Sequence, residues 1–317
     1  MKLVTGGAGF IGSAVARRLL ELGHTVRVLD DFSKGDQTNI PAGCDYLSGD
    51  VSDPDLCREA FTGVDACFHL AAKVGGIGYL YRYPADILVE NNHMLSRVFQ
   101  TATEVRAKVV YVSSSSVFAR ATELPTPEDA VDRSPAPSSA YGFSKLVGEW
   151  YCRAFAQQYG TPFAICRPFN AYGPGELPEN EPGLAHVIPD LIRKIVEFGG
   201  EPLEVFGDGH QSRCFTYVDD LADGIVTAGL HPRGEGEDFN VGTDSETTIL
   251  ELIDLIWEQC GSGERPEIRF GNPIPGDVRR RVPDISKMRD RFGWVAETEL
   301  AGGLRQTVEW YRSLERG

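Results

Sequence analysis

A tyrosine and a lysine stand four residues apart near the middle of the chain, at Tyr141 and Lys145. On a helix this spacing places both side chains on one face, one turn apart. An ammonium group beside a phenol favours the phenolate, so the pair predicts a tyrosine with a lowered pKa that acts as a general base near neutral pH. Spacing alone is equally typical of a solvated helix face, so the interpretation depends on what the chain brings to this pair.

Four consecutive serines, Ser113 to Ser116, follow the apolar and β-branched run 108–112. Such a run is typical of a buried parallel strand, and the serines would stand at its carboxyl end. Open parallel sheets bind ligands outside the carboxyl ends of their strands. We therefore expect serine hydroxyls at a ligand site; a low-complexity linker is the alternative, and the apolar residues on both sides count against it.

The element that would hold the ligand lies at the start of the chain, where Gly6, Gly9 and Gly12 join a short apolar run to a helix-forming segment. The first glycine permits a tight turn, the second lets a diphosphate approach the backbone, and the third lets the helix pack on the strand. The next apolar run ends on Asp30, about twenty residues further on, where a carboxylate reads the 2'-hydroxyl of a ribose. Because this carboxylate would repel the 2'-phosphate of NADP, the pattern predicts NAD.

Other residues near strand ends are expected to line the cofactor. Asp50 suits its adenine edge or caps the helix expected near Pro54, and the two interpretations are compatible. A loop at 73–78, at the carboxyl end of the fourth strand, is expected to be flexible and to face the ligand, with an ordinary surface loop as the alternative. The expected cofactor contacts are Gly6, Gly9, Phe10, Ile11, Gly12, Asp30, Asp50, Val51, Ala71, Ala72, Lys73, Tyr141 and Lys145.

Alternating strands and helices must position these residues, and the hydrophobic periodicity predicts them. Strands are expected at 3–4, 25–29, 44–48, 66–72, 108–112, 163–167, 204–206 and 215–218, with 239–242 returning to the main sheet; helices are expected at 13–22, from 54, 87–105, 140–159, 186–198, 248–259 and from 300. The order predicts an α/β fold, a Rossmann-type doubly wound parallel sheet with a smaller C-terminal α/β substrate lobe. We expect residues 1–167, with parts of 206–245, to form the NAD-binding domain, and 168–205 and 246–317 to form the lobe.

Composition limits the partners. The 317 residues include 31 basic and 46 acidic side chains, a formal charge of −15, which argues against nucleic acid and anionic membranes as partners. A bound phosphate must therefore meet local arginines and backbone amides. Seven scattered cysteines without Cys-x-x-Cys spacing predict neither a disulfide framework nor a metal site. The absence of a long apolar run and a first strand starting at Lys2 predict a cytoplasmic protein.

Together these motifs resemble those of extended short-chain dehydrogenases/reductases of the nucleotide-sugar epimerase and dehydratase group, over nearly the whole chain. The further matching stretches are 167–174, 206–209 with Arg213, 217–220, and 276–279 followed by Pro283 and Asp284. The resemblance implies an NAD-dependent enzyme acting on a nucleotide-diphosphate sugar. It also implies that Asn170 contacts the substrate diphosphate and that Arg213 and Arg279 neutralise it, for which planar guanidinium groups are suited.

In such enzymes a sugar hydroxyl gives its proton to the tyrosinate while a hydride passes to NAD, and the ketone is later reduced again. By resemblance Tyr141 is the base, Lys145 tunes it, and Ser114 holds the sugar oxygen. Dehydratases of this group carry an aspartate-glutamate pair where this chain has Ser115 and Ser116, and decarboxylases commonly carry a glutamate at the second of these positions. Hydroxyls are poor acids and bases, so the serines favour redox-neutral epimerisation at C4. A non-catalytic NAD-binding protein on the same fold is the alternative outside enzymes.

A finer resemblance points to the branch that contains GDP-fucose synthase and GDP-mannose 3,5-epimerase, through 72–77, 83–86 with Asn91, and 186–189. In GDP-fucose synthase the corresponding histidine is the acid/base partner of a cysteine at the place of Ser116. This implies Ser116 and His186 as further catalytic candidates and 3,5-epimerisation as the alternative function, although serine is a weaker acid or base than a thiol. Members often pair through the two long helices near 92–105 and 144–159, which implies a homodimer. The expected substrate contacts are Gly75, Gly76, Asn170, His186, Val187, Arg213 and Arg279.

Overall fold

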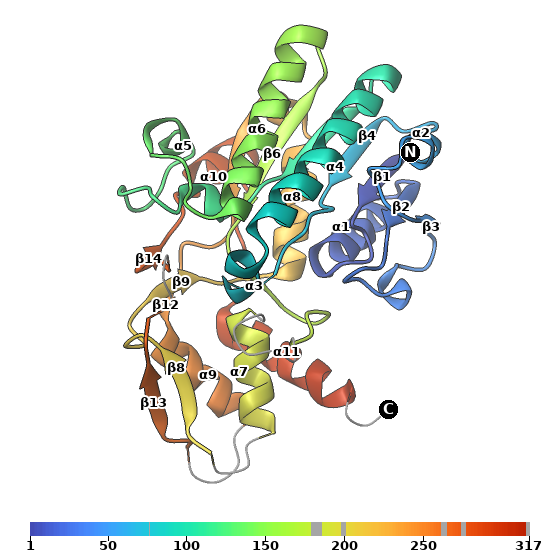
Figure 1. Ribbon diagram of the computed structural model, residues 1–317. Coiled ribbons are helices and arrows are strands. Elements are labelled where there is room, and N and C mark those ends of the chain that lie inside the picture. Colours follow the sequence, from blue (N-terminus) through green and yellow to red (C-terminus); the bar gives the residue numbers. More distant parts are fainter. Residues whose placement is uncertain (76, 179–185, 198–200, 261–264, 274–276, 315–317) are drawn as a thin grey trace.

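A seven-stranded parallel sheet forms the larger part of the molecule in the computed structural model, which describes residues 1–75, 77–178, 186–197, 201–260, 265–273 and 277–314 (Figure 1). The strand order is β11-β6-β5-β4-β1-β2-β3, and the order along the chain reverses between β1 and β4. This is the predicted doubly wound Rossmann-type sheet. Its strands are β1 (Lys2–Thr5), β2 (Val26–Asp30), β3 (Asp45–Ser48), β4 (Ala66–His69), β5 (Lys108–Val112), β6 (Phe163–Pro168) and β11 (Asp238–Val241).

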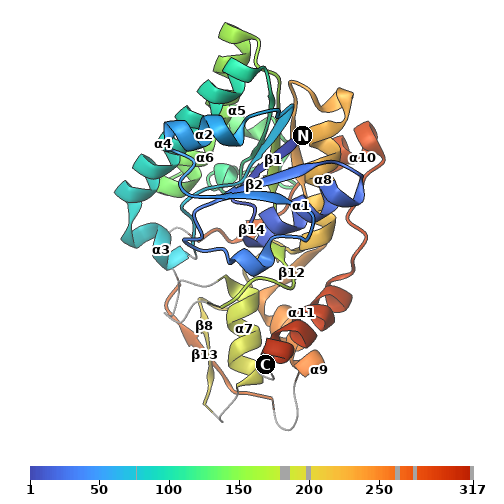
Figure 2. The same cartoon turned by 90° about the vertical axis from the view of Figure 1, so that its right-hand side faces the viewer.

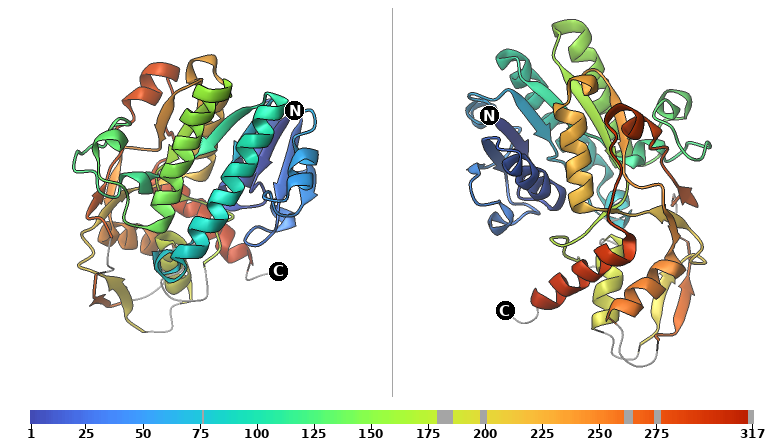
Figure 3. Two further views of the ribbon diagram at one scale, coloured as in Figure 1. Left: turned by 45° about the horizontal axis from the view of Figure 1, so that its top comes forward. Right: turned by 180° about the vertical axis from the view of Figure 1, so that it is seen from behind.

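Helices cover both faces of this sheet, so its inner strands are buried on both sides. Within β1, for example, Leu3 faces one hydrophobic core and Val4 the other. Burial on both faces explains why these strands read as continuous apolar runs in the sequence. One face carries α1 (Phe10–Glu21) and α8 (Val218–Leu230), and the other carries α2 (Pro54–Ala60), α4 (Pro84–Val105) and α6 (Ala140–Tyr159), with α4 and α6 side by side (Figure 3).

The smaller part of the molecule lies beyond the carboxyl ends of the strands (Figures 1 and 2). Its helices enclose a separate hydrophobic core: α7 (Val187–Val196), α9 (Ile249–Cys260) and α11 (Leu300–Leu314). Its paired strands are β8 (Leu203–Phe206) with β13 (Ile268–Gly271), and β7 (Ala171–Tyr172) with β10 (Thr216–Tyr217). A three-stranded sheet at the junction of the two parts contains β12 (Glu246–Thr248), β9 (Ser212–Cys214) and β14 (Arg280–Arg281).

Short elements complete the described chain. They are η1 (Gln37–Asn39), α3 (Ile77–Arg82), η2 (Ser115–Phe118), α5 (Ala130–Arg133), η3 (Pro232–Gly234) and α10 (Ser286–Phe292). The last of these packs against β11 and α8 of the larger part. Among the described helices, none combines the length and the apolar composition needed to cross a bilayer. The seven cysteines are free, and all except the half-buried Cys44 are buried.

Several element boundaries differ from the predictions. The strand expected at 66–72 ends at His69, because the backbone N–H groups of Leu70 and Ala71 both donate to the Thr5 carbonyl and turn the chain over β1. The loop expected to run through 78 is shorter, since α3 begins at Ile77. Val218 was expected to end a strand, but it begins α8, a helix that the sequence did not predict.

Candidate active site

The carboxyl ends of β1, β4 and β5 meet where the strand order reverses, and the glycine turn follows β1. Gly6 has a φ of 71°, and a Cβ there would lie 2.7 Å from the Ala71 nitrogen. A Cβ on Gly12 would lie 2.0 Å from the Gly6 carbonyl oxygen, so both positions need glycine. Gly9 precedes Phe10, the first residue of α1, and no side chain caps this helix. Its first N–H groups therefore point out of a close-packed cradle, which fits the diphosphate of a dinucleotide.

Asp30 ends β2 and is 8% exposed. One carboxylate oxygen accepts from the Ala8 N–H at 2.9 Å and the other from the Phe32 N–H at 2.9 Å. The carboxylate thus ties the glycine turn to the loop after β2. Each oxygen retains further acceptor capacity, so the group also fits the ribose hydroxyls of NAD.

The two interpretations of Asp50 separate in the structure. Asp53 caps α2, and the Asp50 carboxylate accepts instead from the Ser52 N–H at 2.8 Å. The capping alternative is therefore wrong, and a contact with the adenine edge stays a prediction. The Val51 side chain is buried in the core beneath α2 and α4.

Lys73 anchors the loop that follows β4. Its backbone N–H donates to the Asn91 Oδ1 atom at 2.7 Å, and its ammonium group lies 3.2 Å from a Glu90 oxygen. The Asn91 amide also donates to the Ser144 hydroxyl at 3.0 Å, which connects the loop to α6. The start of the predicted flexible loop is thus held by two helices.

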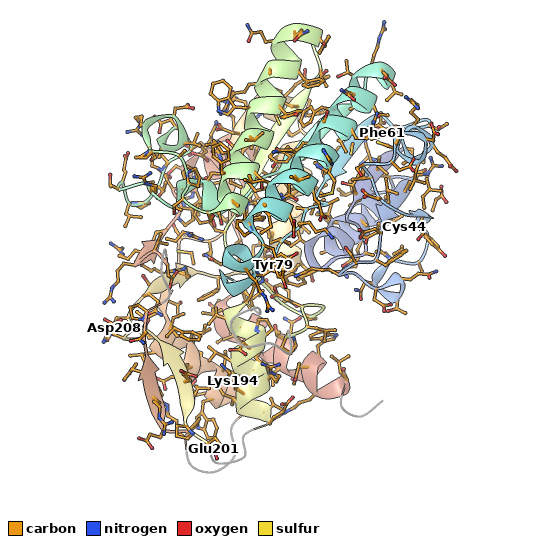
Figure 4. All side chains as sticks on the ribbon, in the orientation of Figure 1. Cys44, Phe61, Tyr79, Lys194, Glu201 and Asp208 are labelled. Carbon is orange, nitrogen blue, oxygen red and sulfur yellow. The ribbon has the colours of Figure 1, made fainter. Side chains whose placement is uncertain are left out.

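Further along this loop, Gly75 is buried, and a Cβ there would lie 2.8 Å from the Tyr79 side chain. Figure 4 shows Tyr79 at the junction of the two parts of the molecule. Gly76, an expected substrate contact, lies outside the described residues.

Ser114, Tyr141 and Lys145 come together at the carboxyl end of β5. Tyr141 and Lys145 occupy the start of α6, and the Ser114 hydroxyl lies near enough to the Tyr141 phenol to lower its pKa. The Lys145 Nζ atom donates to the Val112 carbonyl at 2.8 Å and lies 5.8 Å from the centroid of the Tyr141 ring. The predicted spacing therefore does place both side chains on one face, toward the serines.

The pKa values of this pair differ from the prediction. Burial raises the pKa of Tyr141 to about 12, and the nearby Ser114 hydroxyl lowers it only in part. Burial also lowers the pKa of Lys145 to about 8. Removal of water disfavours the phenolate and the ammonium alike, so the prediction that Lys145 brings the pKa of Tyr141 near neutrality is wrong for the chain itself.

Ser116 lies against the start of α6. A Cβ on Gly142 would lie 2.8 Å from the Ser116 carbonyl oxygen, so this close approach needs a glycine next to Tyr141. The Ser116 N–H donates to the Ser114 hydroxyl oxygen at 3.1 Å. The Ser115 side chain is buried, and that of Ser116 is half-buried.

A buried ion cluster that the sequence did not predict lies behind the serines. Glu149 of α6 and Arg167 of β6 are both fully buried and share two hydrogen bonds of 2.7 Å. Glu149 also accepts from the Ser113 hydroxyl at 2.7 Å, and Arg167 donates to Asp238 at the same distance. The cluster fixes α6 relative to β5 and β6, and thus Tyr141 relative to the serines.

The predicted diphosphate contacts lie at the junction with the smaller part. The Asn170 amide donates to the Cys214 carbonyl at 3.1 Å, and the residue has a positive φ of 38°. Arg213 is 9% exposed and forms an ion pair with Asp277. The Arg279 side chain is 61% exposed and donates to both oxygens of Asp208, at the outer edge of the molecule in Figure 4. Arg279 thus forms an exposed surface ion pair, and its contact with a diphosphate stays a prediction.

His186 and Val187 stand at the start of α7. The Val187 side chain packs against the core of the smaller part, whereas the His186 side chain is 54% exposed. The His186 Nδ1 atom is hydrogen-bonded to Glu176, a partner that the sequence did not predict. Gly175, the residue before Glu176, lies beside Phe10: a Cβ on Gly175 would be 3.7 Å from the Phe10 ring. The loop that carries Glu176 therefore lies next to the start of α1.

Comparisons with known proteins agree with this arrangement. The family model described as the NAD dependent epimerase/dehydratase family matches residues 2–242. The chain is 34% identical to a UDP-glucose 4-epimerase of Mycolicibacterium smegmatis over 98% of both chains. It is 31% identical to a UDP-N-acetyl-alpha-D-glucosaminuronate decarboxylase of Bacillus cytotoxicus, over 99% of this chain and 98% of that one. The structure of Thermotoga maritima UDP-glucose 4-epimerase with UDP-glucose superposes with a TM-score of 0.90 at 31% identity, over 99% of both chains. The chain therefore belongs to the NAD dependent epimerase/dehydratase family, and NAD is its cofactor.

Proposed function

We propose that the protein inverts the configuration at C4 of a nucleotide-diphosphate sugar by oxidation to a 4-keto sugar and reduction from the other side. The observation that carries this proposal is the set of groups around the base: the Ser114 hydroxyl acts on the Tyr141 phenol by lowering its pKa, and the two positions that follow Ser114 are serines. Oxidation and reduction at C4 move one proton and one hydride, and the phenol and serine hydroxyls suffice for the proton. Elimination of water, as in a dehydratase, needs a stronger acid and a stronger base. The relatives named UDP-glucose 4-epimerase support the same reaction.

The chain's own residues would bind the two ligands and move one proton. NAD, when bound, accepts and returns the hydride and supplies a positive charge. The Tyr141 oxygen would take the proton of the C4 hydroxyl and later give it back to the C4 oxygen, while the Ser114 hydroxyl holds that oxygen. Lys145, whose ammonium group donates to the Val112 carbonyl, keeps a cation near the phenol. The glycine turn and Asp30 would hold the dinucleotide through both half-reactions.

The relatives also include decarboxylases, and the sequence leaves 3,5-epimerisation as an alternative. The reactions give different products. NAD-loaded enzyme should convert UDP-glucose to UDP-galactose in deuterated water without deuterium on sugar carbon, because the hydride returns to the carbon it left. Product NMR checks this. Deuterium at C3 or C5, loss of water from C5 and C6, or release of carbon dioxide from UDP-glucuronate without C4 inversion would each replace C4 epimerisation with another reaction. If the enzyme does not act on UDP-glucose, assays with GDP-, dTDP-, CDP- and ADP-sugars identify the nucleotide of the substrate. The proposal is contradicted if none of these nucleotide sugars is inverted at C4.

The assigned base has a separate test. Tyr141→Phe removes only the phenolic oxygen, and turnover should fall by about 10²- to 10⁴-fold, the contribution typical of a positioned general base. Tyr159→Phe on the last turn of the same helix serves as the control, since that side chain is 56% exposed. Comparable turnover of the two variants would show that Tyr141 is not the base.

We also propose that a second copy of the chain covers α4 and α6. On α6, Phe143, Val147, Trp150 and Ala154 follow the spacing of one helix face, and Trp150 is 65% exposed. Val89 of the neighbouring α4 is 53% exposed. An aromatic residue this exposed, in an apolar stripe, is typical of an interface. The cytoplasmic location stays a prediction.

A further inference from the structure

Lys145 is a buried cation without a carboxylate partner. The residue is 5% exposed, and within the described part of the chain its ammonium group donates to one acceptor, the Val112 carbonyl, and forms no ion pair. Burial of an ammonium group disfavours its charged form unless other groups compensate for the lost water. Since burial lowers the pKa of Lys145 to about 8, the charge depends on small contributions from the neighbouring groups.

Tyr111 of β5 contacts Lys145 at two points. The Lys145 Nζ atom lies over the Tyr111 ring, 5.3 Å from its centroid, and is 5.8 Å from the centroid of the Tyr141 ring. Both distances lie within the range in which the negative face of an aromatic ring attracts a cation. The Tyr111 hydroxyl also donates to the Lys145 carbonyl at 3.3 Å. Tyr111 thus contacts both the ammonium group and the backbone of Lys145.

The Tyr111 ring is enclosed between the sheet and α6. Gly148 lies three residues after Lys145 on this helix, and a Cβ there would lie 2.2 Å from the Tyr111 hydroxyl oxygen. The ring also lies beside His69 of β4, with 6.1 Å between the two ring centroids. Tyr111 is only 2% exposed. Its ring therefore has a fixed place beside the ammonium group.

The titratable groups around this pair supply no counter-charge. Burial and the charge of Lys145 lower the pKa of His69 to about 3, so His69 is neutral. Burial raises the pKa of Tyr111 well above its usual value, so Tyr111 is neutral as well. The other groups that face the Tyr111 phenol raise this pKa further, namely Cys152, Glu149 and Tyr141. Glu149, the carboxylate among them, is already paired in the ion cluster behind the serines.

We propose that Tyr111 is a positioning residue whose ring holds the Lys145 ammonium group, in its charged form, beside the Tyr141 phenol. A carboxylate would stabilise the same cation, but its negative charge would oppose the phenolate on Tyr141. An aromatic face stabilises the ammonium group without adding a net charge. The kinetic consequence rests on the proposed function, because there the Tyr141 oxygen must be ionised to take the C4 proton. The charge of Lys145 itself does not depend on that function.

The test measures the titration of Lys145 directly. The chain has seven lysines, so protein labelled with ¹³C at the lysine Cε atoms gives few NMR signals, and the Lys145 signal is assigned by its absence in Lys145→Arg. In NAD-loaded Tyr111→Leu, the Lys145 midpoint should fall by about one pH unit, the effect of losing a desolvated contact between a cation and a ring. Tyr111→Phe keeps the ring, and its midpoint should stay within about 0.3 pH unit of wild type.

Phe99→Leu is the matched control for lost packing. Phe99 is a buried aromatic residue of the same hydrophobic core, and its ring contacts are with Tyr151 and Phe155. Its loss should leave the Lys145 midpoint at the wild-type value. If Tyr111→Leu does not fold, pentafluorophenylalanine in place of Tyr111 keeps the shape of the ring and reverses the polarity of its face. This substitution should lower the midpoint at least as far.

An unchanged Lys145 midpoint in Tyr111→Leu, or an ammonium group that stays charged throughout the titration in both proteins, overturns the proposal. An equal shift in Tyr111→Phe would assign the effect to the hydroxyl, and an equal shift in Phe99→Leu, or none with pentafluorophenylalanine, would assign it to packing.

The alkaline fall of kcat/KM should move to lower pH together with the Lys145 midpoint, because the cation is then lost at lower pH. If the midpoint shifts and the kcat/KM profile does not, Tyr111 has no positioning role in the reaction. If the midpoint shifts while wild type inverts no sugar at C4, only the proposed function is wrong.

Discussion

At the scale of single residues, the Tyr141 phenol sets the expected pH dependence. Burial raises the pKa of Tyr141, and the nearby Ser114 hydroxyl lowers it in part. Ser114→Ala should therefore shift the rise of kcat/KM with pH toward higher pH, by about 1 to 2 pH units for a lost hydrogen bond to a charged group. Ser114→Thr keeps the hydroxyl and should leave the midpoint near that of wild type. A Ser114→Ala profile with an unchanged midpoint would mean that the hydroxyl does not act on the phenol.

Spacing made some of these residues predictable. The ribose contact of Asp30 stays a prediction, whereas the glycine turn was predictable, because a tight turn at Gly6 and a close approach at Gly12 each require glycine. The pKa of Tyr141 was not, because the sequence gives the neighbouring lysine but not the loss of water around both groups.

At the scale of elements, the Glu149 and Arg167 cluster holds the catalytic helix on the sheet. Glu149→Gln leaves the buried Arg167 with Asp238 as its remaining carboxylate partner, and should lower the free energy of unfolding by about 3 kcal/mol, as expected when one member of a buried ion pair is removed. Urea unfolding measures this. Glu104→Gln is the control, since that side chain is 61% exposed and should change stability by less than about 1 kcal/mol. Equal stabilities of the two variants would contradict a structural role for the cluster.

Long elements with a clear hydrophobic period were predictable through β6, and the return of β11 to the sheet was confirmed. Beyond β6 the strands shorten to two to four residues, as in β7, β9 and β10, and so short a run carries almost no period. The start of α8 was hidden for this reason: Val218 follows β10 directly and continues its apolar run. Interactions between distant segments, such as Arg167 with Asp238, leave no local pattern in a single sequence.

At the scale of the whole molecule, the exposed face of α4 and α6 predicts a dimer. A stable interface needs roughly 1,200–2,000 Å² of buried surface, and we expect the α4 and α6 helices of two copies to supply it with Trp150 near the centre. Trp150→Asp buries a charge there and should weaken dimerisation by roughly thirtyfold or more, the effect of losing about 2 kcal/mol at a central aromatic residue. Light scattering after size exclusion over a dilution series measures it. Phe270→Asp on β13 is the control, because that side chain is also exposed, at 55%, but lies in the smaller part. A wild-type protein that stays monomeric at every concentration, or equal effects of both substitutions, would place no partner on this face.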